Sequence, residues 1–307
     1  MIAKLLIYKI LQLFSIMVIG FMIAKLKIIK PKESVVLSKI SLYLLMPSAI
    51  INAFDFERSD SLNEGLLLAF VAAIIIHIIL YFLDIFYGKF ICDNPVERAS
   101  VMYSNAGNLI IPIVSFVLGN EWVVFSTAFL SVQLFFIWSH GIRLFSKEEK
   151  FNIKKVLLNV NIIAICLGMI MMLSGIRLPS FVKDITSSFG SLLGPLGMLI
   201  AGILAANIDF KKTLSCKRIY RVIIFRLIIY PVLTLITLKL LSFISVINGE
   251  KILLISFLAS ITPAAATVMQ FSQINDSDAE YATAINIFTT LGCILTMPIF
   301  VMLFTNI

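Results

Sequence analysis

Two interruptions in long apolar segments constrain this chain more than any other feature of its sequence. The first, residues 104–112 (SNAGNLIIP), lies inside an apolar run from about residue 99 to residue 118, which is long enough to cross a bilayer. Glycine and proline weaken a helix there, and each unpaired backbone group in hydrocarbon costs several kcal/mol. Broken helix is therefore expected only against other protein or a water-filled cavity.

A second interruption, residues 261–267 (ITPAAAT), lies inside the apolar run 252–273. Pro112 and Pro263 are 151 residues apart, close to half of the 307-residue chain. Two interrupted spans at matching places in two halves are typical of a transporter that binds its substrate at the breaks.

Composition places the chain in the membrane. Hydrophobic residues make up 60% of it, charged residues 14%, and the mean hydropathy is +1.03. The net charge of +8 comes from cations in short loops, so we expect no nucleic-acid partner. The four cysteines have no paired spacing, and the two histidines form no metal or nucleophile motif. We therefore expect neither an enzyme nor a bound metal or cofactor.

Ten apolar runs predict an all-α membrane protein with ten transmembrane helices. The first run is too long for the apolar part of a signal peptide and is interpreted as a retained span. The runs are 5–24, 34–54, 66–87, 98–118, 121–142, 156–175, 184–207, 219–245, 252–273 and 282–304.

The loop charges predict the orientation, because lysine and arginine collect on the cytoplasmic side. Sixteen of them lie in the loops after runs 1, 3, 5 and 7, and five lie on the opposite side. The sequence thus predicts that both termini lie outside, in a plasma membrane or bacterial inner membrane.

An internal repeat divides the chain into residues 1–150 and residues 151–307. The segment LLMP at 44–47 recurs as LLGP at 192–195, an offset of 148 that agrees with the 151 between Pro112 and Pro263. Five spans per half is an odd number, so the second half must enter the membrane inverted. We expect two inverted five-helix repeats, with the fourth helix of each one broken.

The breaks supply the candidate substrate site. A helix that restarts after a break presents unpaired N–H groups and the positive end of its dipole, which suit a carboxylate. No acidic residue lies in or beside either break, which favours a small organic anion over an obligatory sodium ion. The candidate binding residues are Asn105, Gly107, Asn108, Pro112, Thr262, Pro263 and Thr267.

Ionisable residues within the runs each need a reason. Asp84 and Arg226 lie at similar depth, and either pair with each other or extend independently toward the membrane surface. His77, two turns before Asp84, either shuttles protons or is a neutral hydrogen-bonded histidine. His140, near a run end, is expected to extend toward the surface. Four further polar residues either line the wall of the site or, as we favour, bond between helices: Gln133, Asn286, Thr289 and Thr290.

Several of these segments resemble the auxin efflux carrier family, which includes plant PIN-type auxin exporters and bacterial carriers linked to malonate and malate. The resemblance extends over the whole chain. It rests on MPSAI at 46–50, NAG at 105–107 with Ile111-Pro112, PLG at 195–197, the run from Thr262-Pro263 to residues 278–280 (DAE), and TMP at 296–298.

The resemblance implies an alternating-access, elevator-type secondary transporter. Helices 1, 2, 6 and 7 would form a scaffold that makes a homodimer, and helices 3–5 and 8–10 a mobile transport domain. The family's asparagine and two prolines at the crossing carry over onto Asn105, Pro112 and Pro263, while Asn108 departs from the smaller or apolar residue of many members. The alternative is a sodium-coupled organic anion symporter of the bile-acid symporter type.

Overall fold

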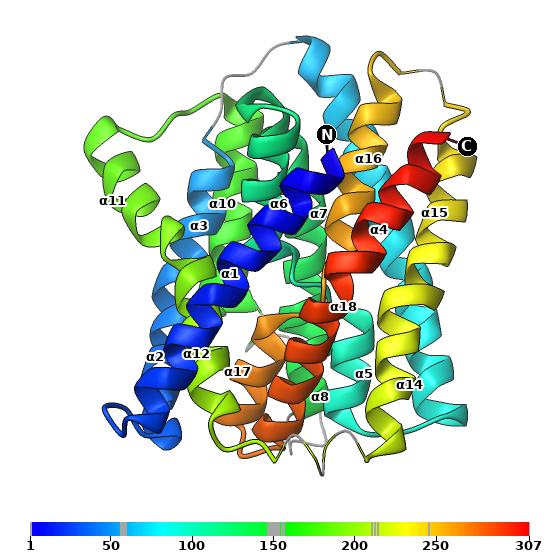
Figure 1. Cartoon of the computed structure of the whole chain (residues 1–307). Coiled ribbons are helices and arrows are strands. Elements are labelled where there is room, and N and C mark those ends of the chain that lie inside the picture. The colour runs from blue at the N-terminus through cyan, green and yellow to red at the C-terminus, as the bar shows by residue number, and fades with distance from the viewer. Residues whose placement is uncertain are drawn as a thin grey trace.

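The computed structural model describes residues 2–55, 60–145, 154, 157–209, 211, 213, 215–244 and 246–306. Over these residues the protein is helical, and its only β-type pairing is an isolated bridge between Ser104 and Ala264. Figure 1 shows the helices side by side in one bundle, with both termini at the same end. The boundary expected between the repeats, at residue 150, lies outside the described residues.

The first half of the chain contains α1 to α8, and its elements follow the first five apolar runs. Proline at the first helical position and an asparagine cap start α5: the Asn94 side chain accepts hydrogen bonds from Val96 N (3.0 Å) and Glu97 N (3.1 Å). The bounds are α1 Ile2–Lys25, α2 Ser34–Ile40, α3 Met46–Ala53, α4 Asp60–Phe90, α5 Pro95–Met102, α6 Ala106–Val117, α7 Val123–Phe136 and α8 Ile142–Phe145.

The second half repeats the pattern of long helices with one interruption. Its helices are α10 Val160–Ser174, α11 Ser180–Ser191, α12 Leu193–Ala205, α14 Lys217–Ile224, α15 Tyr230–Leu241, α16 Gly249–Ser260, α17 Ala266–Ile274 and α18 Ala279–Asn306. Short 3₁₀ turns at Pro31–Glu33 and Asn120–Trp122 precede α2 and α7.

Three π turns widen the long helices. They join α2 to α3 (Ser41–Leu45), α7 to α8 (Ile137–Gly141) and α14 to α15 (Phe225–Ile229). Such wide turns often mark functional positions, and a proline follows two of them, at Pro47 and Pro231. Three polar residues of the sites described below, Ser41, His140 and Arg226, lie in these turns.

Six continuous helical segments among the described residues are long and apolar enough to cross a membrane. Parts of α1 and α10 are shorter apolar helices, whereas α5–α6 and α16–α17 are each divided by a break. The six are Pro31–Ala53, Glu64–Phe90, Val123–Phe145, Ser180–Ala205, Lys217–Leu241 and Ala279–Asn306. The chain therefore forms a multi-pass membrane protein.

The closest helix packing is between α1 and α12. A side chain added at Gly20 would collide with the backbone of Leu199, and one at Gly202 with the backbone of Met17. Small residues let two helix backbones approach in this way within a membrane, where packing rather than hydrophobicity holds helices together.

Candidate functional site

The two predicted breaks are present, and they pair with each other. The chain leaves helix after Met102 and restarts at Ala106, and it leaves helix again after Ser260 and restarts at Ala266. Asn105 N donates to Pro263 O at 2.8 Å, and Ala265 N donates to Tyr103 O at 3.0 Å. Each break thus supplies hydrogen-bond partners for backbone groups of the other break that have none in their own helix. The apolar surroundings require such pairing.

The first break is completed from α7. Gln133 accepts through Oε1 from Ser104 N at 3.2 Å and from the Ser104 hydroxyl, and donates through Nε2 to Ser104 O at 2.9 Å. Both residues are buried. The expectation that Gln133 bonds between helices is confirmed, and its partner is the break itself.

The second break is completed from α18. Asn286 Nδ2 donates to Ala264 O at 2.7 Å, and the Thr289 hydroxyl oxygen accepts from Ala264 N at 3.1 Å. These two residues also bond between helices, as expected. Asn286 and Thr289 therefore support the crossing, whereas Thr290 donates to Asn286 O within its own helix at 2.7 Å, contrary to the expectation.

Arg226 binds carbonyls at the C-terminal ends of α5 and α16, the helices that lead into the two breaks. Its side chain is fully buried, and its guanidinium donates to Ser260 O (2.5 Å), to Thr262 O (2.7 and 3.1 Å) and to Val101 O (3.3 Å). The last carbonyls of a helix carry the negative end of its dipole, so a cation is favourable there. Arg226 therefore ties the end of α5 to the end of α16.

Neither interpretation of Asp84 and Arg226 is correct, because the two side chains do not pair with each other and both are buried rather than extended to the surface. Asp84 is bound instead by Arg98, with Nη2 to Oδ2 at 2.6 Å and Nε to Oδ1 at 3.1 Å, and by His140 Nε2 at 3.2 Å. The expected outward course of His140 is wrong as well, because its ring turns inward to this carboxylate. Arginine forms such two-pronged contacts with carboxylates readily, and Arg226 is occupied by carbonyls.

His77 is a hydrogen-bonded core residue. Its Nδ1 lies 2.7 Å from Ala73 O in its own helix, and its ring packs against Phe129 and Phe136. This is the second of the two interpretations that its sequence position allowed.

A small cavity lies where the two helices restart. It has a volume of about 20 Å³, enough for one water molecule. Three of the predicted binding residues line it: Asn105, Gly107 and Thr267. The other lining residues are Ser41, Met46, Ser104, Gln133, Leu134, Ile137, Leu193 and Gln270.

Asn105 has the geometry of a ligand-binding residue. It is 3% exposed, and its Oδ1 accepts from Ala266 N, the first residue of α17, at 3.4 Å. In the part of the chain that the structure describes, its Nδ2 has no hydrogen-bond partner. A buried amide donor without a partner is costly, and a ligand acceptor in the cavity would satisfy it.

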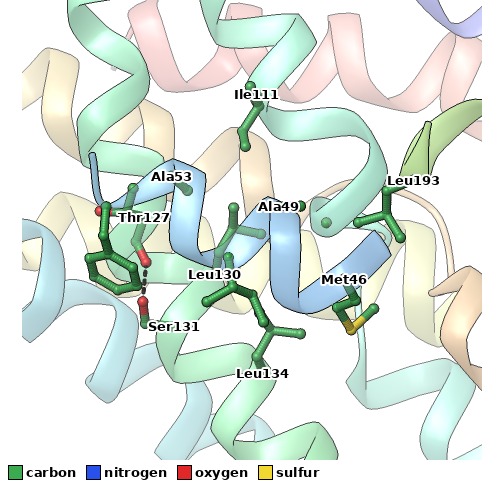
Figure 2. Close-up of a pocket in the computed structure, with 12 residues that line it drawn as sticks. Met46, Ala49, Ala53, Ile111, Thr127, Leu130, Ser131, Leu134 and Leu193 are labelled. Atoms are coloured by element: carbon green, nitrogen blue, oxygen red, sulfur yellow. Dashed lines mark hydrogen bonds between the residues drawn. The ribbon is translucent and has the colours of Figure 1, made fainter. Parts of the chain in front are cut away.

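Gly107 leaves the space open. A methyl group added at its Cα would meet no atom within 4 Å. A second, mostly apolar cavity of about 30 Å³ is also lined by Gly107. It shares Met46, Leu134 and Leu193 with the first cavity. Figure 2 shows this space between α3, which carries Met46, Ala49 and Ala53, and α7, which carries Leu130 and Leu134.

The remaining predicted residues are placed differently. The Thr262 hydroxyl donates to Ala259 O at the end of α16, and its carbonyl binds Arg226, so this residue supports the break. Pro263 presents its carbonyl to Asn105. The side chains of Asn108 and Pro112 lie outside the described residues, although both positions belong to α6.

The electrostatic layout separates two regions of the crossing. The negative ends of α5 and α16 meet Arg226, and the positive ends of α6 and α17 meet at the cavity. Polar amides and hydroxyls line that cavity, and none of its lining residues is acidic. The arrangement suits an anionic group at the cavity.

The chain matches a family of known proteins. The model of that family, described as membrane transport protein, matches it twice, at residues 5–155 and at residues 149–301. No curated protein in the comparison matches it. Since the two matches together extend over nearly the whole chain, the chain belongs to the auxin efflux carrier family of membrane transport proteins.

Proposed function

We propose that the protein is a secondary active transporter that moves a small organic anion, such as a carboxylate, by alternating access. The observation that carries the proposal is that the N-termini of two helices, α6 and α17, meet at a cavity lined by Asn105. Among the described residues, Nδ2 of that side chain has no hydrogen-bond partner. Helix N-termini and amide donors both stabilise negative charge. Binding between the two breaks is the usual arrangement in transporters with discontinuous helices.

The architecture that we propose is ten membrane spans in two inverted five-helix repeats, residues 1–150 and residues 151–307. Two findings support it: the family model matches once in each half, and each half contains one pair of helices divided by a break. The broken pairs, α5–α6 and α16–α17, cross by the antiparallel bridge of Ser104 with Ala264.

We further propose an elevator-type movement of the part that contains α4–α8 and α14–α18 against a scaffold of α1–α3 and α10–α12, with a homodimer formed through the scaffold. The close contact of α1 with α12 at Gly20 and Gly202 supports a rigid scaffold. Across the boundary, Gln273 of α17 bonds to Ser34 and Ser38 of α2 at 2.7 Å each. Such contacts must be exchanged when one part slides on the other.

The cavity of about 20 Å³ is too small for an organic anion. We interpret this structure as a conformation in which the two parts are closed on the site. The apolar cavity next to it, between α3 and α7, lies on the same boundary and would join the site when they separate.

The test is ligand binding by Asn105→Ala. Thermal stabilisation of the purified protein, screened over mono- and dicarboxylates, identifies a ligand. Losing one hydrogen bond to a charged group costs about 1.5–3 kcal/mol, so affinity should fall at least about tenfold. The matched control is Asn161→Ala, because Asn161 is equally buried and donates to Leu42 O at 3.0 Å, away from the cavity.

We expect the control to lower stability and to leave affinity unchanged. If Asn105→Ala binds the identified ligand as tightly as the parent, the site does not lie at the crossing.

We propose that both termini lie outside the cell, on the evidence of the loop charges. Ile247, in a loop and 78% exposed, and the exposed Lys217, at the start of α14, lie at opposite ends of a membrane-spanning helix. A single cysteine at position 247 of a cysteine-free protein should react with an impermeant maleimide added to intact cells, and one at 217 should not. The reverse labelling would invert the topology.

A further inference from the structure

A second polar site lies beside the crossing and opens into a cavity. That cavity has a volume of about 400 Å³, room for several water molecules. Its lining includes the exposed Asp93 and Arg143, and Arg98 and His140 at its inner wall. Asp84 lies behind these two, with a fully buried side chain.

We propose that His140 is a proton-binding site through which protonation from this cavity controls the crossing of the two broken helices. This inference builds on the proposed transport function and adds the coupling ion, a proton. It rests on the contacts of the His140 ring with Asp84 and Tyr103.

The hydrogen bonds around the ring need two N–H donors. His140 Nε2 lies 3.2 Å from Asp84 Oδ2, and Nδ1 lies 2.8 Å from the Tyr103 hydroxyl oxygen. The same hydroxyl donates to Phe136 O at 3.0 Å. An imidazolium ring satisfies all three contacts together, because it donates to Asp84 and to Tyr103 while Tyr103 donates to Phe136.

A neutral ring cannot satisfy all three. If its one N–H faces Asp84, then Nδ1 is an acceptor and the Tyr103 hydroxyl must turn from Phe136 to the ring. If the N–H faces Tyr103, a lone pair of Nε2 faces the carboxylate. Adding a proton from cavity water at Nδ1 therefore turns the Tyr103 hydroxyl toward Phe136, and returning that proton to the water reverses the change.

Charged and titratable groups surround the ring. Arg98 bridges two carboxylates, Asp84 at 2.6 Å and Asp93 at 2.7 Å. Among the described residues, Tyr81 on α4 packs its ring edge-on against His140, and Arg143 lines the same cavity.

Tyr103 connects the proton site to the breaks. It is the C-cap residue of α5, where the first break begins, and its carbonyl accepts the hydrogen bond from Ala265 N that pairs the two breaks. Its ring packs against Gly141 in the same π turn as His140, where a larger residue would collide with it. A change in the bonds of its hydroxyl therefore acts on the residue that holds the crossing.

The experiment measures amide hydrogen exchange of residues 262–268 in purified protein, with no substrate present. Rates are corrected for the intrinsic effect of pH and compared at about pH 5 and about pH 8, the range in which histidine ordinarily changes charge. We expect protection of this segment to be about threefold to tenfold higher at the lower pH, since one hydrogen bond distinguishes the two states. His140→Gln should remove that difference.

His77→Gln is the matched control, because His77 is the other histidine of the chain and bonds to Ala73 in its own helix. It should keep the pH difference. Tyr103→Phe keeps the titrating ring but removes the connection, so it should lose the difference as well, and it serves if His140→Gln does not fold.

An equal pH difference in the parent protein and in His140→Gln or Tyr103→Phe would overturn the proposal, as would no difference in the parent. Because no ligand is used, this result is independent of the carboxylate-binding test, and the failure of one can be distinguished from the failure of the other.

Discussion

Both helix breaks leave backbone groups without partners in their own helices, and different residues satisfy those groups at each break. The first break supplies its own polar side chains, Ser104 and Asn105, and receives one amide from α7, that of Gln133. The polar side chain of the second break, that of Thr262, bonds back to Ala259 O, so the side-chain contacts to Ala264 come from Asn286 and Thr289 of α18. One break carries the candidate ligand-binding group, and the other is a supported backbone.

Arg226 is the element that the two breaks share. It binds one carbonyl before the first break and two at the second, and it lies at the negative ends of both arriving helices. The cavity lies at the positive ends of both departing helices. The comparison teaches that a buried cation can satisfy the backbone at the negative ends of broken membrane helices, while their positive ends remain available to a ligand.

Replacing Arg226 tests this shared support and should have the largest effect. Arg226→Met keeps the volume and leaves buried carbonyls of both breaks without donors, which should cost several kcal/mol even after the cost of burying the charge is recovered. The readout is the melting temperature and the monodispersity of the purified protein. Arg218→Met is the control, since Arg218 is exposed on the same helix. A variant that melts like the parent would mean that other groups satisfy these carbonyls.

The separate supports test whether the breaks act as one unit. Gln133→Met and Asn286→Leu should each lower the unfolding free energy by about 1–3 kcal/mol, because each leaves a buried backbone group unpaired. Gln133→Met should cost more, since Gln133 makes three contacts with Ser104 and Asn286 makes one with Ala264. The double variant should deviate from additivity by about 0.5 kcal/mol or more. Strict additivity would show that the bridge does not couple the breaks.

Gly107 and Thr267, the second residues of α6 and α17, sharpen the comparison with the smallest expected effects on stability. Gly107 leaves space in the cavity, and Thr267 supplies a hydroxyl at the equivalent place in α17. Gly107→Ala should fold normally, with stability unchanged or raised by up to about 1 kcal/mol. Thr267→Val should weaken carboxylate binding by about tenfold or more, because the hydroxyl would no longer donate a hydrogen bond to the carboxylate.

Gly107→Leu is the informative companion in the same binding titration. Its side chain would extend into the cavity and should exclude the ligand while the protein remains folded. Binding as tight as that of the parent would place the ligand away from Gly107.

Contacts between distant segments explain which predictions failed. Asp84 and Arg226 lie at similar depth, yet depth along a helix does not say which way a side chain faces. Arg226 and His140 both lie in π turns. A π turn adds one residue to a helical turn, which rotates the following side chains by about 100° from the face that a regular helix predicts. Depth in the membrane and nearness to a run end therefore did not predict the partners of these two residues.

The sequence by itself determined the membrane class and the two interruptions, because apolar length and the cost of proline and glycine in hydrocarbon are local properties. Only the tertiary structure decided that Gln133, Asn286 and Arg226 satisfy the breaks, and that His140 faces Asp84. A buried polar group needs a partner, but many residues of the right chemistry are available along the chain. Which of them becomes the partner depends on how the helices pack, and on where a π turn changes the face that a side chain occupies.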